Sequence, residues 1–170
     1  NIAMILSSTV IGKGPVLIIL HGLFGEGKNW LSVAKALSNS LEVHLIDQRN
    51  HGNSFHSIEH NYQVMASDLN TYIKSKNINN FFLLGHSMGG KTAMEFALLY
   101  PKNVDKLIIV DIAPKLYKNN HESIFEGLHA VLSKAASRKQ AQLILMSYTD
   151  DLILTNFLLK GLFFLDNKPQ

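Results

Sequence analysis

The chain has 170 residues, of which 46% are hydrophobic and 17% charged, and its net charge is +3. These values predict a single globular domain with a substantial buried core and exclude a disordered chain. The basic residues are spread along the sequence without forming a block, which argues against a nucleic-acid partner. The absence of cysteine excludes a disulfide framework, a thiolate metal site and a catalytic thiol.

The apolar runs are short. The run from Val16 to Leu20, for example, falls far short of the roughly 18 to 20 residues that a membrane-spanning helix needs. Residues 1–6 lack the basic and apolar regions of a secretory signal. We therefore expect no transmembrane helix, and a location in the cytoplasm or in an organelle matrix.

Short runs of β-branched and aromatic residues alternate with stretches of helical spacing along the first two thirds of the chain. This alternation predicts βαβ units, an α/β fold with a mostly parallel sheet and helices on both faces. The predicted strands are Val16–Leu20, Glu42–Ile46, Phe81–Leu84 and Lys106–Val110, and residues 2–11 add an edge strand or hairpin. The predicted helices run from about Trp30 to Leu37, from Tyr62 to Ile73, and from about Gly89 to Tyr100, where Pro101 ends the last one.

After Asp111 the pattern becomes mostly helical. Three helices are predicted around 124–132, 141–145 and 152–159. We therefore expect a core at residues 1–114 and a helical cap or lid at residues 115–170, placed over the carboxyl edge of the sheet where open α/β sheets bind ligands. An ordinary helical subdomain is the alternative interpretation.

Residues 85–89 read Gly-His-Ser-Met-Gly and match the pattern G-x-S-x-G. A predicted strand precedes the motif and a predicted helix follows it, which is the context of a nucleophile elbow. Side chains at Gly85 and Gly89 would clash in so sharp a turn, and the turn presents the Ser87 hydroxyl to a substrate. The helix that begins there directs the Met88 N–H toward developing negative charge, so we expect it to be an oxyanion donor.

A second oxyanion donor is expected from the loop after the first clear strand, where residues 21–25 read His-Gly-Leu-Phe-Gly. Gly22 allows the chain to fold back so that the Leu23 N–H points at the oxyanion, and the Phe24 N–H is the neighbouring candidate. We expect His21 to organise this loop through hydrogen bonds rather than to serve as the catalytic base.

These motifs resemble those of the α/β-hydrolases, and within them the YbfF-type esterases and their mitochondrial abhydrolase-domain relatives. The resemblance extends over about residues 14–165 and includes Asn29-Trp30, Asp-Gln-Arg-Asn-His-Gly-Asn-Ser at 47–54, Asp-Ile-Ala-Pro at 111–114, Tyr117 and His121. It implies a serine esterase or thioesterase that acts on short acyl esters or acyl-CoA, in a bacterial cytoplasm or a mitochondrial matrix. Such chemistry needs no metal or organic cofactor, and no cluster of His, Asp and Glu here has metal-ligand spacing.

The resemblance also implies the remaining catalytic groups, in the chain order Ser, Asp, His. Asp111 follows a predicted strand next to the elbow and is the expected acid, although many α/β-hydrolases carry the acid one strand later. The histidine is expected after the last strand of the family's fold, beyond Gln170. His121 and His129 are the lesser alternatives within the chain.

Other polar residues are assigned structural roles. We expect Asp47 and Arg49 to brace the loop around the site, His51, His56 and His60 to be solvated or bonded within that loop, and His86 to point away from the Ser87 hydroxyl. Asp150 and Asp151 have the character of residues at a helix start.

The resemblance further implies that the chain is part of a longer enzyme and lacks the C-terminal strands of the fold. Strand 106–110 would then have an unpaired edge and exposed apolar faces. Two functional alternatives remain open at this point. One is a hydrolase of lactones or carbon–carbon bonds, and the other is a non-catalytic binding module with a hydrolase-like fold.

Overall fold

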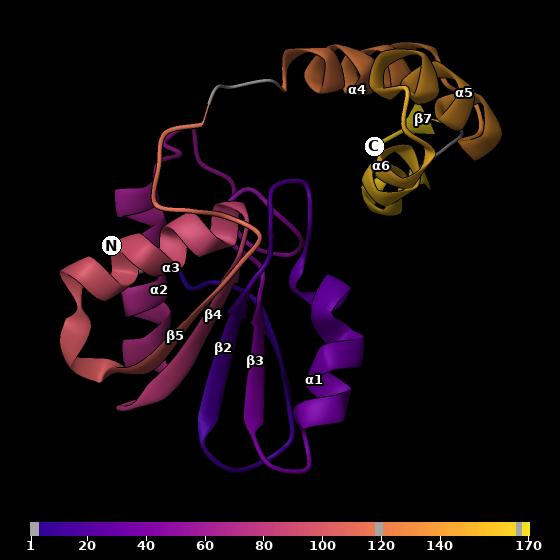
Figure 1. Ribbon diagram of the computed structural model, residues 1–170. Coiled ribbons are helices and arrows are strands. Elements are labelled where there is room, and N and C mark those ends of the chain that lie inside the picture. The colour runs from indigo at the N-terminus through magenta and orange to yellow at the C-terminus, as the bar shows by residue number, and fades with distance from the viewer. Residues whose placement is uncertain (1–3, 118–120, 166–167) are drawn as a thin grey trace. The chain divides into compact units, whose positions relative to one another are not determined.

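The computed structural model describes residues 4–117, 121–165 and 168–170 (Figure 1). The chain divides into two compact units, Asn1–Pro114 and Lys115–Gln170. None of the helices in the described ranges combines the length and the apolar character that crossing a bilayer requires.

The first unit alternates strands and helices along the chain. Its strands are β1 (Ser8–Ile11), β2 (Val16–Leu20), β3 (Glu42–Ile46), β4 (Phe81–His86) and β5 (Val104–Val110). Its helices are α1 (Leu31–Leu37), α2 (Tyr62–Ser75) and α3 (Met88–Leu99), with short 3-10 helices η1 (Gly27–Trp30) and η2 (Pro101–Asn103).

The strands form one sheet in the order β1-β3-β2-β4-β5. β1 runs antiparallel to β3, whereas the other neighbouring strands are parallel. The predicted mostly parallel sheet and the predicted N-terminal edge strand are therefore confirmed. Leu20 is in register with Ile46 on one side and with Gly85 on the other. The loops that follow β2, β3 and β4 consequently leave the sheet at the same edge, which is where open α/β sheets place ligand sites.

Each face of the sheet has its own apolar cluster. On β2, Ile18 and Leu20 pack with α2 and α3, whereas Leu17 and Ile19 pack on the opposite face with α1. Figure 1 shows α2 and α3 covering one face and α1 the other. A strand buried on both faces reads as an unbroken hydrophobic run, which is why β2 could be located from the sequence.

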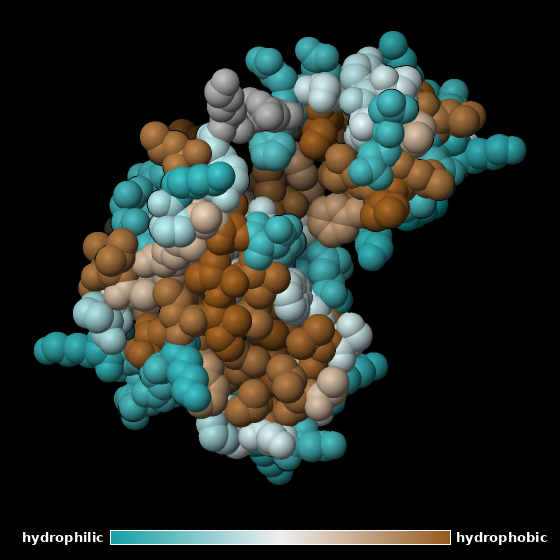
Figure 2. All heavy atoms as spheres, in the orientation of Figure 1, coloured by the Kyte–Doolittle hydropathy of each residue, from teal (hydrophilic) through white to brown (hydrophobic). Residues whose placement is uncertain are grey.

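β5 is the last strand in the sheet order, and within the described residues it pairs with β4 alone. Its Leu107 and Ile108 are 40% and 41% exposed. Figure 2 shows hydrophobic side chains gathered over the strands of this unit. The edge and the apolar exposure expected for this strand are therefore present.

Several boundaries differ from the sequence-based prediction. β4 continues to His86 instead of ending at residue 84, because its ladder with β5 extends through the pair His86 and Val110. β5 begins at Val104 instead of residue 106. α3 begins at Met88 and ends at Leu99, one residue earlier at each end than predicted.

The second unit is mostly helical. Its helices are α4 (Glu122–Lys134), α5 (Arg138–Thr149) and α6 (Leu152–Leu158), followed by the 3-10 helix η3 (Leu159–Gly161) and a small antiparallel pair, β6 (Phe164–Leu165) and β7 (Lys168–Pro169). The three predicted helices are confirmed, whereas the short strand pair was not predicted. The function of this unit as a cap stays a prediction.

One prediction in this unit is half wrong. Asp151 is the N-cap of α6, and its carboxylate accepts hydrogen bonds from the N–H groups of Ile153 and Leu154. Asp150 instead ends α5 in a left-handed conformation with φ of 48°. Short polar side chains such as Asp tolerate this conformation at a helix C-terminus, so Asp150 stops a helix and does not start one.

Candidate active site

Ser87 occupies a strained turn between β4 and α3. Its φ of 51° and ψ of −116° are unfavourable for any residue with a side chain. A Cβ atom at Gly85 would overlap the Gly89 carbonyl, and a Cβ atom at Gly89 would overlap the Leu20 carbonyl. Backbone atoms are thus in direct contact at this turn, which explains why both of these positions of the motif are glycine. Strand, sharp turn and helix together form the geometry of a nucleophile elbow.

The candidate acid lies beside this turn. The Ser87 N–H donates a hydrogen bond to the Val110 carbonyl at 3.1 Å, so the residue after Val110 emerges next to the elbow. That residue is Asp111, which has φ of 54° and a side chain that is 87% exposed. Its Oδ2 lies 3.9 Å from Nε2 of His86, because the pairing of β4 with β5 brings the two strand ends together. This contact was not predicted from the sequence.

Both expected oxyanion donors belong to segments next to Ser87. Met88 is the first residue of α3, where backbone N–H groups have no acceptor within the helix. The loop with Leu23 comes close as well, because a Cβ atom at Gly22 would lie 3.4 Å from the Cβ atom of Ser87. Within the described residues neither the Leu23 N–H nor the Met88 N–H donates a hydrogen bond. Both remain available for an anionic oxygen.

His21 organises the loop, as predicted. Its Nε2 accepts a hydrogen bond from the Gln48 N–H at 3.1 Å, so the proton must be on Nδ1, which donates to the Gly22 carbonyl at 2.8 Å. Burial lowers the pKa of His21 to about 4. The imidazole is therefore neutral and fully occupied, which excludes it as the base for Ser87.

The next amide in this loop is also occupied. The Phe24 N–H donates to Nε2 of His51 at 3.2 Å, and Phe24 has φ of 61°. This contact was missed from the sequence, because the two residues lie 27 positions apart and no local pattern links them. Of the two neighbouring candidates for the oxyanion donor, Leu23 is therefore the one whose N–H has no acceptor in the described part of the chain.

Asp47 fixes the loop that follows β3. One of its carboxylate oxygens accepts the Gly27 N–H at 2.8 Å, and the other accepts the Asn53 N–H at 2.9 Å. Asp47 is buried, so these hydrogen bonds replace the water that its carboxylate loses on folding. Asp47 braces this loop, as predicted, and does not serve as a second candidate acid.

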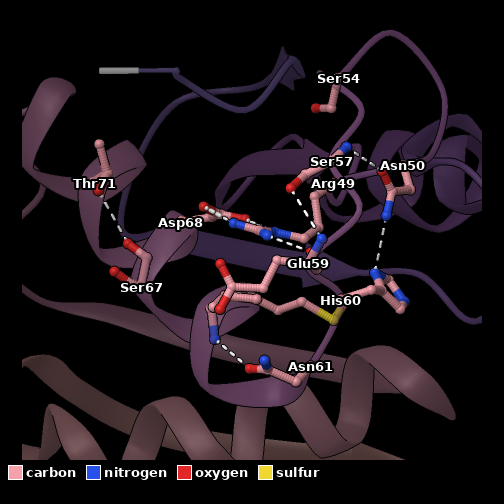
Figure 3. Close-up of polar contacts among 12 residues, drawn as sticks. Arg49, Asn50, Ser54, Ser57, Glu59, His60, Asn61, Ser67, Asp68 and Thr71 are labelled. Atoms are coloured by element: carbon pink, nitrogen blue, oxygen red, sulfur yellow. Dashed lines mark hydrogen bonds and ion pairs between the residues drawn. The ribbon is translucent and has the colours of Figure 1, made fainter. Parts of the chain in front are cut away.

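Arg49 connects the same loop to α2 (Figure 3). Its guanidinium forms a bidentate pair with Asp68, with distances of 2.5 and 2.8 Å, and donates to the Glu59 carbonyl. The hydrogen bonds to Asp68 raise the pKa of Arg49, which stays charged. His60 also bonds within this loop, to the Asn50 amide at 3.2 Å. The bracing function expected of Arg49 is thus confirmed.

The remaining histidines have different positions. His44 lies inside β3 and contacts the Tyr72 hydroxyl and the Glu42 carboxylate. Within residues 4–117 no imidazole forms a hydrogen bond with the Ser87 hydroxyl. His121 and His129 belong to the second unit, and their candidacy as the base stays a prediction. No group of three or more His, Asp and Glu residues in the described ranges could hold a metal ion.

Comparison with known proteins identifies the family. Residues 15–163 match the alpha/beta hydrolase fold family. Esterase YbfF of Escherichia coli K12 is 37% identical over 147 residues, which cover 85% of this chain and 58% of that protein. The sn-1-specific diacylglycerol lipase ABHD11 of Danio rerio is 36% identical over 160 residues, which cover 89% of this chain and 50% of that protein.

A solved structure agrees with these relatives. The structure named marine microorganism esterase is 42% identical, with a TM-score of 0.92, over 98% of this chain and 67% of that one. The chain spans about half the length of the curated relatives that it matches. The residues that match the family include the elbow and most of the sheet. The chain therefore belongs to the α/β-hydrolase family.

Proposed function

We propose that the protein containing this chain is a serine hydrolase that cleaves short acyl esters or acyl-CoA thioesters through an acyl-enzyme on Ser87. The observation that carries the proposal is the strained backbone of Ser87 between two unoccupied amides. Strain of this kind persists where the surrounding structure enforces it, and it is concentrated at functional sites. The names of the relatives, an esterase and a diacylglycerol lipase, support an acyl ester as the substrate class.

The chemistry proceeds in two steps. Oγ of Ser87 attacks the acyl carbonyl carbon while an imidazole takes the hydroxyl proton, and the carbonyl oxygen becomes an oxyanion bound by the Leu23 and Met88 N–H groups. The imidazolium then protonates the departing alcohol or thiol. Water attacks the acyl-enzyme by the same route and releases the acid. Asp111 is assigned to orient the imidazole and to stabilise its charge.

The histidines described above do not supply the catalytic imidazole. His21 and His51 are held by backbone groups, and His44 is bonded to Tyr72 and Glu42. No imidazole within residues 4–117 forms a hydrogen bond with the Ser87 hydroxyl, so we assign the base to a histidine outside this range. Activity is accordingly measured on the product of the longest reading frame that contains residues 1–170, called the encoded protein below.

The experiment compares Ser87→Ala with Ser38→Ala in the encoded protein. Ser38 is half-buried, and its hydroxyl donates a solvent-exposed hydrogen bond to the Lys35 carbonyl of its own helix end, so its loss leaves the site intact. With p-nitrophenyl butyrate and butyryl-CoA as substrates, Ser87→Ala should lower kcat by at least about 10⁴-fold. Ser38→Ala should match the wild type. Unchanged turnover in Ser87→Ala would contradict the serine mechanism.

A non-catalytic binding module is the second candidate, because no imidazole within residues 4–117 forms a hydrogen bond with the Ser87 hydroxyl. The same assay separates the two. A binding module would show no turnover that depends on Ser87, whereas binding of a non-hydrolysable acyl ether, followed by calorimetry, would persist in the Ser87→Ala variant.

A further inference from the structure

His51 makes two hydrogen bonds that hold two loops together. Its Nδ1 lies 2.9 Å from the Arg49 carbonyl, and its Nε2 lies 3.2 Å from the Phe24 amide nitrogen. A carbonyl accepts and an amide N–H donates, so Nδ1 must carry the proton and Nε2 must be bare. His51 fits this site only as the neutral imidazole with the proton on Nδ1.

The Phe24 N–H that His51 accepts belongs to a strained residue. Phe24 has φ of 61°, a left-handed conformation that is costly for a large side chain. Gly25 closes the same turn by donating to the Gly22 carbonyl at 3.1 Å. The hydrogen bond from Phe24 to His51 is thus one of the contacts that offset the strain and keep the turn in one conformation.

The direction of the Leu23 amide follows from the same turn. The Gly22 carbonyl is held by the His21 imidazole and by the Gly25 N–H. A trans peptide directs its N–H opposite to its carbonyl, and no cis peptide is present in the described residues. The Leu23 N–H is therefore turned away from His21, while His51 fixes the next peptide along the chain.

We propose that His51 is a positioning residue for the oxyanion site: its neutral imidazole accepts the Phe24 N–H and thereby sets the angle at which the Leu23 N–H meets the substrate oxygen. The inference rests on the proposed function. Protonation of His51 would place a hydrogen on Nε2, which would then face the Phe24 N–H as a second donor. The hydrogen bond that holds the loop would be lost. Full activity of the site therefore requires His51 to be neutral.

The surroundings of His51 favour the neutral form. Burial lowers the pKa of His51, and repulsion from His60 and His56 lowers it further, while the hydrogen bond to the Arg49 carbonyl and the charge of Asp47 oppose the shift. The rings of His21 and His60 lie 5.1 and 6.2 Å from the ring of His51. At neutral pH the imidazole is therefore uncharged and able to accept the Phe24 N–H.

Two variants of the encoded protein separate the acceptor from the rest of the side chain. His51→Gln can present an amide oxygen near the place of Nε2 and still accept from Phe24. His51→Asn is too short to reach Phe24, although its amide can still donate to the Arg49 carbonyl. We expect His51→Asn to lower kcat by about 10- to 100-fold with KM changed less than about twofold, since the oxyanion contact is made in the transition state. His51→Gln should recover most of kcat.

The pH profile provides a readout that a purely structural function would not alter. In the wild type, log kcat should fall with a slope greater than one over the pH range in which His51 is protonated, because both the catalytic base and His51 lose their neutral forms there. In His51→Gln the slope should stay at one, because an amide does not titrate. A slope of one in both proteins would overturn the proposal.

Nuclear magnetic resonance tests the contact without activity. A scalar coupling between the Phe24 amide nitrogen and Nε2 of His51 is expected at neutral pH and should vanish as His51 becomes protonated. Absence of the coupling at neutral pH, or a kcat of His51→Asn equal to that of the wild type while Ser87→Ala is inactive, would overturn the inference alone. Retained turnover in Ser87→Ala would instead show that the proposed function itself has failed.

Discussion

The hydrogen bond from the Ser87 N–H to the Val110 carbonyl, 3.1 Å long, joins the turn that carries the candidate nucleophile to the end of the strand that carries Asp111. Ser87 and Asp111 therefore lie close together without long side chains, because the pairing of β4 with β5 brings their backbones together. Ser87 and Asp111 also share positive φ values, 51° and 54°. Both strand ends therefore turn sharply out of the sheet at the same place.

Asp111→Asn tests the assignment of the acid. If Asp111 orients the base, the amide favours the wrong imidazole tautomer, and kcat of the encoded protein should fall by about 10⁴-fold. Its melting temperature should change little, because the side chain is 87% exposed. Asp105→Asn on the same strand is the matched control, since Asp105 is exposed and bonds to Asn80. Equal activity of Asp111→Asn and the control would assign the acid to another strand.

Gly89→Ala tests the packing of the elbow. The added methyl group would meet the Leu20 carbonyl and the His21 carbonyl, both of which are backbone groups of β2 and its loop that cannot rotate away. We expect a loss of at least about 3 kcal/mol in the free energy of unfolding, measured by urea denaturation. Gly161→Ala is the control, because nothing lies within 4 Å of a Cβ atom at that position. A Gly89→Ala protein as stable as this control would show that the turn is not tightly packed.

The buried histidines predict that stability falls in mild acid. Burial lowers the pKa of His21 from 6.5 to about 4, so between these values the unfolded chain binds a proton that the folded chain does not. The stability due to neutral His21 is complete above pH 6.5 and is lost as the pH falls toward about 4, by up to about 3 kcal/mol. The pKa values of His51 and His60 are also lowered and act in the same direction.

Urea denaturation across this pH range measures that effect. The wild type should lose stability steadily as the pH falls below 6.5. His21→Gln should be less stable at neutral pH but should depend less steeply on pH, because the titrating group is gone. Identical slopes for the two proteins would contradict the assignment of a neutral, buried His21.

The edge of β5 predicts self-association of residues 1–170 when they are produced alone. An edge strand with exposed apolar side chains can pair with a strand of another chain. β5 is such a strand, because its Leu107 and Ile108 are exposed. Light scattering during size-exclusion chromatography should show oligomers, and Ile108→Lys should reduce them. A compact monomer that melts cooperatively would contradict this expectation.

Local sequence patterns were sufficient to locate the elements that position the site. β2 is buried on both faces and is therefore a continuous apolar run, and α2 shows its buried face as Met65, Leu69, Tyr72 and Ile73. The elbow was recognisable because glycine is required where backbones touch. Each of these signals comes from residues close together in the sequence.

What sequence reasoning missed depends on contacts between distant segments. The bond between Phe24 and His51, and the approach of His86 to Asp111, arise only when separate loops meet at the sheet edge. The end of β4 was set two residues too early because its ladder partner on β5 extends the strand. Asp150 was assigned to the wrong end of a helix because aspartate suits both an N-cap and a left-handed C-terminus.

The nucleophilic function of Ser87 can be tested directly by reacting the encoded protein with diethyl p-nitrophenyl phosphate and mapping the adduct by mass spectrometry. Phosphorylation occurs at an activated nucleophile, so we expect one diethylphosphate group on the peptide that contains Ser87, with loss of esterase activity in proportion to labelling. The Ser87→Ala protein should remain unlabelled. An adduct on a different residue, or full activity after Ser87 is labelled, would show that Ser87 is not the nucleophile.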